Sequence, residues 1–271
     1  VYVMTNGRCV AERDPRTCDV ADLQLLMLGR ELSDQYARKR SPVAADAPSV
    51  VPRLAVRDLA LAGAFAPITL DLRPGEVLGI AGVEGSGREQ LCRTLFGAVR
   101  PTSGTIEIDG KQVSFGSPAD AVAAGIGYIP AERRAEGIIA GLSVKENMTL
   151  AHPEVVSRGP ILDTRKEAGL VRQWIERLSI KTPTADATAG NLSGGNQQKV
   201  VVAKWLIATD LKILVLDHPM RGLDVGAKAE IFALIRELSV QGIAVLLIAD
   251  TLEELLALSD TIVVMRDGEV T

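Results

Sequence analysis

A glycine-rich turn between an apolar run and a helical pattern has the residue types needed to hold a phosphate group. The turn spans Gly82 to Glu89 and follows the apolar run from Val77 to Ala81. Its spacing matches the pattern G-x4-G-K-[ST], in which glycines let consecutive backbone N–H groups point at phosphate oxygens at the start of a helix. Such a turn also occurs without a ligand. The predicted nucleotide-binding residues are Gly82, Gly85, Ser86, Gly87, Arg88 and Glu89.

Two side chains of this turn depart from the pattern and change its chemistry. Arg88 stands where a lysine normally reaches the terminal phosphates, and its planar guanidinium is not equivalent to a compact ammonium group. Glu89 stands where a hydroxyl would bind magnesium, and a carboxylate about 4 Å from another negative group is repelled by roughly 4 kcal/mol at an effective dielectric constant near 20. We therefore expect weakened nucleotide binding, unless a cation sits between the two negative groups.

A second motif, LSGGNQQK from Leu192 to Lys199, precedes an apolar strand that ends at Asp217. With these residues, and with Arg221 to Asp224, the chain resembles the nucleotide-binding domains of ABC transporters. LSGG-x-Q is their signature, the strand resembles their magnesium-binding strand, and the segment after it resembles their D-loop. The residues that the resemblance implies are the signature Ser193, Gly194, Gly195, Asn196 and Gln197, the magnesium ligand Asp217, and the D-loop residues Gly222, Leu223 and Asp224.

The resemblance also implies an architecture and a way of pairing. Two such domains pair head to tail, and the signature amides of one cap a helix aimed at the γ-phosphate of the nucleotide that the other holds. Each site is then built from two half-sites, with ATP and Mg²⁺ as cofactors. The implied fold is an α/β P-loop NTPase with a mostly parallel sheet, an antiparallel β subdomain and a helical subdomain that carries the signature.

A finer resemblance is to the second ATPase half of the double-length subunits that drive simple-sugar import in bacteria. It rests on the segments 129–134, 135–137, 191–199 and 222–228. It implies that residues 53–271 form a second nucleotide-binding domain, truncated at its end, and that residues 1–36 are the tail of a preceding half. A related group of importers carries nucleosides, so the substrate stays open.

The chain departs from the family at positions that normally do chemistry. His218 follows Asp217 where a catalytic glutamate is usual, and Asp250 stands at the position of the switch histidine. A histidine with an ordinary pKa near 6.5 can orient or deprotonate water, but it is not a carboxylate. Ala131 stands where a glutamine couples nucleotide to the membrane partner, and Glu132 can partly replace it. Loss of the base is the favoured interpretation.

The ends of the chain share the pattern V-M-x-x-G, at Val3 to Arg8 and Val264 to Glu269, which favours an internal repeat. Residues 22–36 show a helical stripe that includes Leu23, Leu26 and Met27. Residues 37–52 combine basic residues and prolines with no apolar period, so we predict a linker there.

Apolar strands alternate with helical patterns after residue 53, which indicates an α/β domain with a largely parallel sheet. The predicted strands are 77–81, 126–129, 213–217, 244–248 and 261–265. Capping boxes are predicted at Ser143 with Glu146, Thr164 with Glu167, and Thr251 with Glu254. Leu170, Trp174 and Leu178 share one helical face and are expected in the core.

Composition excludes several classes of protein. The 271 residues carry a net charge of −4 and 3% aromatics, which leaves neither a basic footprint nor a stacking platform for nucleic acid. No apolar run reaches the roughly 18 residues of a membrane-spanning helix. Cys9, Cys18 and Cys92 are widely spaced, so they predict neither a disulfide framework nor a zinc site and fit a reducing compartment.

Other residues have less specific interpretations. His152 beside Pro153 is expected to be a solvated surface residue. Arg133, Arg134 and Glu136 form a mixed-charge loop that is expected to face solvent, near the transmembrane partner if the resemblance holds. Phe65 lies where the family often stacks an aromatic ring on adenine, although a core role is favoured.

These observations leave two classes of function open. The first is an ATPase domain that energises sugar import, with this half lending its signature while its own site is degenerate and its intrinsic activity low. The second is a silent dimerisation or regulatory half, and a non-transport ABC protein is disfavoured because basic insertions are lacking. The implied partners are the first half of the same subunit, transmembrane permease subunits and, indirectly, a periplasmic sugar-binding protein. The implied location is the cytoplasmic face of the bacterial membrane.

Overall fold

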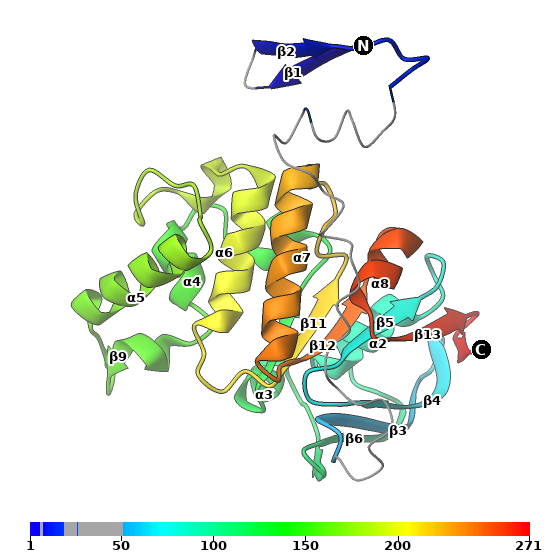
Figure 1. The fold of residues 1–271 in the computed structure, drawn as a ribbon. Coiled ribbons are helices and arrows are strands. Elements are labelled where there is room, and N and C mark those ends of the chain that lie inside the picture. The colour runs from blue at the N-terminus through cyan, green and yellow to red at the C-terminus, as the bar shows by residue number, and fades with distance from the viewer. Residues whose placement is uncertain (6–7, 19–25, 27–50) are drawn as a thin grey trace.

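A six-stranded sheet forms the centre of the part of the chain that the structure describes, which is residues 1–5, 8–18, 26 and 51–271 of a computed structural model (Figure 1). The strand order is β14-β13-β5-β12-β11-β8. Neighbours run parallel except for the edge pair β13 and β14. The strands are β5 (Val77–Ala81), β8 (Ile126–Ile129), β11 (Ile213–Asp217), β12 (Ala244–Ile248), β13 (Thr261–Arg266) and β14 (Glu269–Val270).

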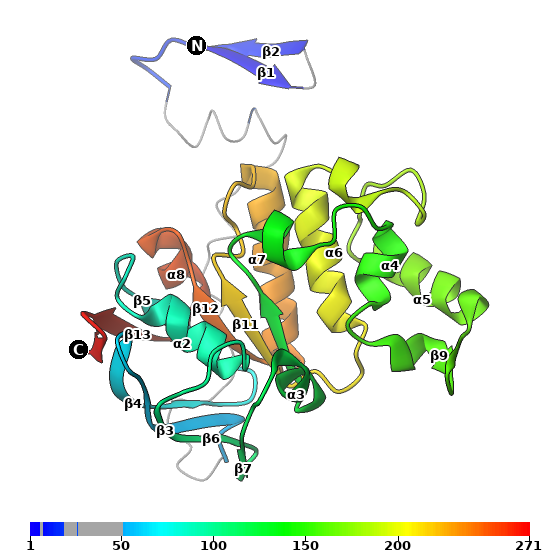
Figure 2. The same ribbon diagram turned by 180° about the vertical axis from the view of Figure 1, so that it is seen from behind.

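The five predicted strands of this sheet are confirmed, and the last extends one residue further, to Arg266. Every residue of β11 and of β12 is buried. Strands covered on both faces read as continuous apolar runs, which is why these segments were recognisable in the sequence. Figures 1 and 2 show α7 (Val225–Val240) and α8 (Leu252–Leu258) over one face and α2 (Arg88–Leu95) and α3 (Pro118–Ala123) over the other.

A separate antiparallel sheet packs beside the first and has the order β4-β3-β6-β7. Its strands are β3 (Leu54–Leu61), β4 (Phe65–Leu72), β6 (Ser103–Ile108) and β7 (Lys111–Val113). Alternate residues of β4 are buried, as expected for a strand with one covered face. The expected antiparallel β subdomain is confirmed.

The expected helical subdomain is also present, as α4 (Val144–Thr149), α5 (Thr164–Arg177) and the start of α6 (Gly194–Leu206). A short hairpin of β9 (Ser157–Arg158) and β10 (Ile161–Leu162) connects α4 to α5. Leu178 is buried, and Leu170 and Trp174 pack against the core, so the predicted core face of α5 is confirmed. No helix in the described residues is long and apolar enough to cross a membrane.

The predicted capping boxes have different outcomes. Ser143 caps α4, with its hydroxyl accepting from the N–H of Glu146 while the Glu146 carboxylate accepts from the N–H of Ser143. Thr251 caps α8 by accepting from the N–H of Glu254.

The box predicted at Thr164 is wrong. Asp163 is the N-cap of α5, and its carboxylate accepts from the N–H of Lys166. A charged carboxylate one residue earlier is the stronger acceptor for the helix start. The Glu167 side chain is instead buried and accepts a hydrogen bond from the Thr149 hydroxyl at 2.8 Å.

Hairpins of the same register occur near both ends of the chain. In the first, between β1 (Tyr2–Thr5) and β2 (Arg8–Glu12), Met4 pairs with Cys9 and Thr5 with Arg8. In the second, between β13 and β14, Met265 pairs with Val270 and Arg266 with Glu269. Corresponding residues of the two hairpins are therefore separated along the chain by the same number of positions as the two V-M-x-x-G patterns. The predicted helix at 22–36, apart from Leu26, and residues 37–50 of the linker predicted at 37–52 lie outside the described residues.

Candidate functional site

Parallel strands bring the two motifs of the candidate site to one edge of the sheet. The glycine-rich turn follows β5, and Asp217 is the last residue of β11. Both strands pair with β12 in parallel, so their carboxyl ends lie at the same edge. Open α/β sheets bind ligands at this edge.

The backbone of the glycine-rich turn keeps the shape of a phosphate cradle. Gly85 and Gly87 have φ angles of 82° and 96°, which favour glycine. A Cβ atom on Gly87 would lie 2.7 Å from the carbonyl oxygen of Ala64, so a larger residue does not fit there. Gly87 is also the N-cap of α2 and makes no side-chain cap bond, which leaves the first N–H groups of the helix available to an anion.

The Arg88 side chain is held by groups of the protein itself. Its Nε donates to Glu89 Oε1 at 2.9 Å, and its Nη2 lies 3.3 Å from Nε2 of His218. Arg88 and His218 are both buried. Arg88 is therefore paired with Glu89, the next residue in the chain.

Both oxygens of the Asp217 carboxylate accept hydrogen bonds from protein side chains. Its Oδ1 accepts from Nδ1 of His218 at 2.7 Å, and its Oδ2 accepts from the hydroxyl of Tyr128 at 2.8 Å. Burial, followed by the charge of Asp217, raises the pKa of Tyr128 far above its usual value, so the hydroxyl stays a donor. Tyr128 is a site residue that the sequence analysis missed. The only signal for it was a hydroxyl on a buried strand.

These hydrogen bonds assign the proton of the His218 ring. A carboxylate only accepts and a guanidinium only donates, so Nδ1 carries the hydrogen that Asp217 accepts and Nε2 accepts from Arg88. Both ring nitrogens are then occupied, and no lone pair is left to deprotonate water. His218 is also held at a φ of 49°, which is uncommon for a residue with a side chain.

The side chains at this site are bonded to each other rather than arranged around a cation. Each oxygen of Asp217 accepts one hydrogen bond, Glu89 is paired with Arg88, and Ala131 offers no side-chain oxygen. Within the described ranges, no group of three or more histidine, cysteine, aspartate or glutamate side chains could hold a metal ion. The cradle fits an anion, and each oxygen of Asp217 keeps a lone pair with which it could meet a cation that is held mainly by phosphate oxygens and waters.

Asp250 lies beside the same cluster. Its Oδ1 accepts from Nε of Arg221 at 3.2 Å and lies 3.9 Å from Nε2 of His218. Arg221 Nη1 also lies 3.7 Å from Glu132 Oε1. The predicted switch position is therefore paired with Arg221 and lies beside the buried His218.

The signature turn leaves its serine exposed, whereas its asparagine and glutamine are hydrogen-bonded to neighbouring segments. Ser193 is the exposed N-cap of α6, and its hydroxyl accepts from Nδ2 of Asn196 at 2.8 Å without capping the helix. Gln197 is buried and donates to the carbonyl groups of Ala189 and Gly190. The backbone N–H groups at the start of α6 are therefore not capped by a Ser193 side chain.

The D-loop connects β11 to α7. Asp224 caps α7 by accepting from the N–H of Ala227 at 2.9 Å, and Leu223 is buried. Gly222 has a φ of 65°. A Cβ atom added to Gly222 would lie 3.7 Å from Nη2 of Arg133, a residue of the π-helical turn Arg133–Gly137.

The expectation that the loop containing Arg133 faces solvent is wrong for Arg133 itself. The residue is partly buried, and its Nη1 donates to the carbonyl oxygen of Arg221 at 2.6 Å. Burial and the neighbouring Arg134 lower its pKa. Sequence patterns carry no signal for this contact, because the two residues lie in separate loops.

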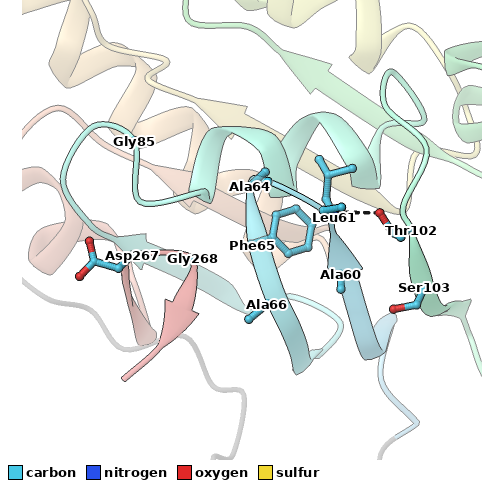
Figure 3. Close-up of a pocket in the computed structure, with 12 residues that line it drawn as sticks. Ala60, Leu61, Ala64, Phe65, Ala66, Gly85, Thr102, Ser103, Asp267 and Gly268 are labelled. Atoms are coloured by element: carbon cyan, nitrogen blue, oxygen red, sulfur yellow. Dashed lines mark hydrogen bonds between the residues drawn. The ribbon is translucent and has the colours of Figure 1, made fainter.

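A cavity of about 590 Å³ lies beside the glycine-rich turn, between the tip of the antiparallel sheet and Gly268 (Figure 3). Phe65 lines it, but only 4% of this residue is exposed, so its ring offers little surface to an adenine base. The rest of the lining is mainly small residues, with Thr102 accepting from the N–H of Ala62 at 2.9 Å.

The expectation that His152 is a solvated surface residue is wrong. The residue is 6% exposed and its ring meets Trp205 edge to face, with centroids 6.0 Å apart. Its Nδ1 lies 3.1 Å from Glu154 Oε1. Pro153 starts a 3₁₀ turn here, which folds the ring onto the end of α6.

Comparisons with known proteins identify the family of this chain. Residues 65–221 match the family described as ABC transporter. The ribose import ATP-binding protein RbsA of Chromobacterium violaceum is 42% identical over 99% of this chain and 52% of that protein. The arabinose import ATP-binding protein AraG 2 of Burkholderia cenocepacia is 42% identical over 97% of this chain and 52% of that protein. The chain therefore spans about half the length of these curated relatives.

Solved structures show the same fold. The dimeric structure of a post-hydrolysis state of the ATP-binding cassette MJ0796, bound to ADP and Pi, covers 80% of this chain and 96% of its own, with a TM-score of 0.69 and 21% identity. A nucleotide-free ATP-binding cassette from an ABC transporter gives a TM-score of 0.67 at 23% identity, over 81% of this chain and 89% of its own. Because the family match covers more than half of its residues, this chain belongs to the ABC transporter family, with the P-loop NTPase fold of its ATP-binding cassettes.

Proposed function

We propose that this chain is the second nucleotide-binding half of a double-length ATP-binding subunit that energises import of a simple sugar. The proposal is supported by relatives named as ribose, arabinose and galactose import ATP-binding proteins, of which the chain spans about half. The matching hairpin registers at β1–β2 and β13–β14 are consistent with residues 1–36 being the tail of a first half and residues 53–271 the second cassette.

In this proposal the two halves contribute unequally to the ATP sites. The signature turn at Ser193 completes the working site, whose phosphate loop belongs to the first half. The site formed by this chain's own turn is degenerate and serves a structural or regulatory role. One contrast supports this assignment. The side chains of Arg88, Asp217 and His218 are hydrogen-bonded to each other and to neighbouring side chains, whereas Ser193 is exposed at a helix start that no side chain caps.

Electrostatics support the same division of roles. Arg88 contributes one positive charge, whereas Glu89 and Asp217 contribute two negative charges, so the cluster is net negative where a polyphosphate would sit. Negative charges in a partly buried site repel an added anion strongly. The hydroxyl that would bind magnesium in this turn is replaced by Glu89, whose carboxylate is paired with Arg88. Turnover by this half alone is therefore expected to be low.

The proposed partners follow from the same assignment. They are the first half of the same subunit, transmembrane permease subunits and, indirectly, a periplasmic sugar-binding protein. The proposed location is the cytoplasmic face of the bacterial membrane, as a peripheral subunit. With a net charge of −4 and few aromatic residues, nucleic acid is not a proposed partner.

A substitution at the signature tests the proposal in the double-length subunit. Ser193→Tyr places a bulky ring at the helix start and is expected to reduce ATP turnover at least about a hundredfold, because the γ-phosphate contact is lost. Ser114→Tyr, at an exposed position after β7, is the matched control and is expected to leave turnover unchanged. Normal hydrolysis by the Ser193→Tyr variant would show that the signature does not complete the working site.

The isolated chain tests the degenerate-site component separately. Binding of magnesium-ATP, measured by calorimetry, is expected to be weak, and phosphate release is expected to be absent. Efficient hydrolysis by the isolated chain would overturn the degenerate assignment while leaving the importer family intact.

A further inference from the structure

The Arg133 guanidinium lies where the signature turn and the D-loop meet. Its Nη1 donates to the carbonyl oxygen of Arg221, which precedes Gly222, at 2.6 Å. Its Nη2 lies only 2.5 Å from the position that a Cβ atom would take on Gly194, so the group rests directly against the first residue of α6. It also lies 3.7 Å from the Cβ position of Gly222. One side chain therefore touches both segments.

Glycine at both positions is what allows this contact. A planar guanidinium can pack flat against backbone that carries no side chain, whereas a lysine ammonium cannot. The packing has a cost, because burial lowers the pKa of Arg133 and its Nε is buried with no hydrogen-bond partner among the described residues. A side chain held at such a cost, with one hydrogen bond to the D-loop, suits a positioning role.

A second contact between the same elements does not involve Arg133. A Cβ atom on Gly195 would lie 2.9 Å from Cβ of Ala227, in the first turn of α7. The start of α6 is thus held against α7 on one side and against the D-loop through Arg133 on the other. The two contacts can be separated by mutation.

We propose that Arg133 is a positioning residue that holds the signature turn and the D-loop in one fixed arrangement, so that both reach the nucleotide of the opposite half together. This inference rests on the proposed function, in which the signature completes the working site. Arg133 acts through the backbone of Gly194 and Arg221. Loss of Arg133 therefore slows the step that follows pairing of the two halves around ATP. It leaves nucleotide binding by the phosphate loop of the opposite half unchanged.

The test measures kcat and nucleotide affinity separately in the double-length subunit. Arg133→Gln and Arg133→Lys are both expected to lower kcat about tenfold, because small misplacements of a catalytic group are costly. The Kd for a non-hydrolysable ATP analogue is expected to change less than about twofold. Arg172→Gln, which removes the same charge from an exposed position of α5, is the control and is expected to keep kcat within about twofold.

A double-mutant cycle identifies the contact. Gly194→Ala keeps Arg133 but displaces its guanidinium, which is the far end of a flexible side chain, so this variant is expected to fold and to lower kcat as Arg133→Gln does. In the Arg133→Gln background, Gly194→Ala is expected to add less than about a twofold loss, because the contact is already gone. Gly195→Ala, which meets Ala227 instead, is expected to act independently of Arg133→Gln.

Each contrary result has a distinct meaning. Full activity of Arg133→Gln or Arg133→Lys, with Ser193→Tyr inactive, overturns the positioning role and leaves the proposed function standing. Independent effects of Arg133→Gln and Gly194→Ala also overturn it. An active Ser193→Tyr variant overturns the proposed function itself.

Discussion

Arg88 and His218 are 130 residues apart in the chain, yet Nη2 of the arginine lies 3.3 Å from Nε2 of the histidine. The contact joins the glycine-rich turn after β5 to the end of β11. Because the guanidinium can only donate, it occupies the one ring nitrogen that Asp217 leaves free. The residue at the usual position of a catalytic glutamate is thereby tied to the residue at the usual position of the phosphate-binding lysine.

The first prediction concerns turnover. Arg88→Gln and His218→Asn in the double-length subunit are expected to change ATP turnover by less than about threefold, since neither residue belongs to the proposed working site. Steady-state phosphate release measures this, with Ser193→Tyr as the inactive reference. A hundredfold loss in either variant would instead assign catalysis to this chain's own turn.

The second prediction concerns the charge at Glu89. Glu89→Gln removes a negative charge from the start of α2, so the affinity of the isolated chain for tripolyphosphate is expected to rise at least about tenfold at low salt. The gain is expected to shrink as salt is added. Glu84→Gln removes the same charge from an exposed position of the same turn and is expected to have a smaller effect. Equal effects of the two variants would exclude a specific role for Glu89.

The third prediction concerns pH. Burial lowers the pKa of Lys204 from 10.5 to about 8. Between pH 8 and 10.5 the unfolded chain binds the proton that the folded chain has lost, so the free energy of unfolding rises with pH, by at most about 3 kcal/mol from this group.

Lys204→Met tests this by chemical denaturation at several pH values. The stability of the wild type relative to the variant is expected to increase from pH 8 to 10.5 and to be constant below pH 7. Lys111→Met, at an exposed strand position, is expected to show no such trend. A flat difference for Lys204→Met would contradict the lowered pKa.

The fourth prediction concerns the loop before α4. Asn147 is 1% exposed; its Oδ1 accepts from the N–H of Ile139, and its Nδ2 donates to the carbonyl groups of Ile139 and Ser143. Asn147→Leu leaves these backbone groups unpaired and is expected to lower the free energy of unfolding by about 3 kcal/mol. Ser143→Ala, which removes only the cap hydroxyl, is expected to cost about 1 kcal/mol. Equal losses in the two variants would mean that Asn147 is not the main anchor of this loop.

Much of the sheet could be predicted from sequence because its strands are covered on both faces. β11 and β12 must then be continuous apolar runs, which no other element of that length requires. The start of α5 was misplaced because Asp163 and Thr164 are both good caps, and their order of preference depends on geometry that the sequence does not carry.

For the interior of the site, the sequence identified some of the residues but not the hydrogen bonds and ion pairs between them. Glu89 was identified as an unfavourable charge, but its pairing with Arg88 depends on a rotamer. Tyr128 and Arg133 were missed as contributors because their partners, Asp217 and Arg221, lie far away in the chain. The burial of His152 was missed because the fold of the adjacent turn decides it.

The network from Tyr128 through Asp217, His218 and Arg88 to Glu89 also constrains how this cassette can evolve. Its inner members are almost completely shielded, whereas the Glu89 side chain is 22% exposed. Replacing one of the buried side chains alone leaves its buried neighbour without a hydrogen-bond partner, which lowers the free energy of unfolding. Substitutions of Arg88, Asp217 or His218 are therefore expected to be accepted only together with a change in the bonded neighbour.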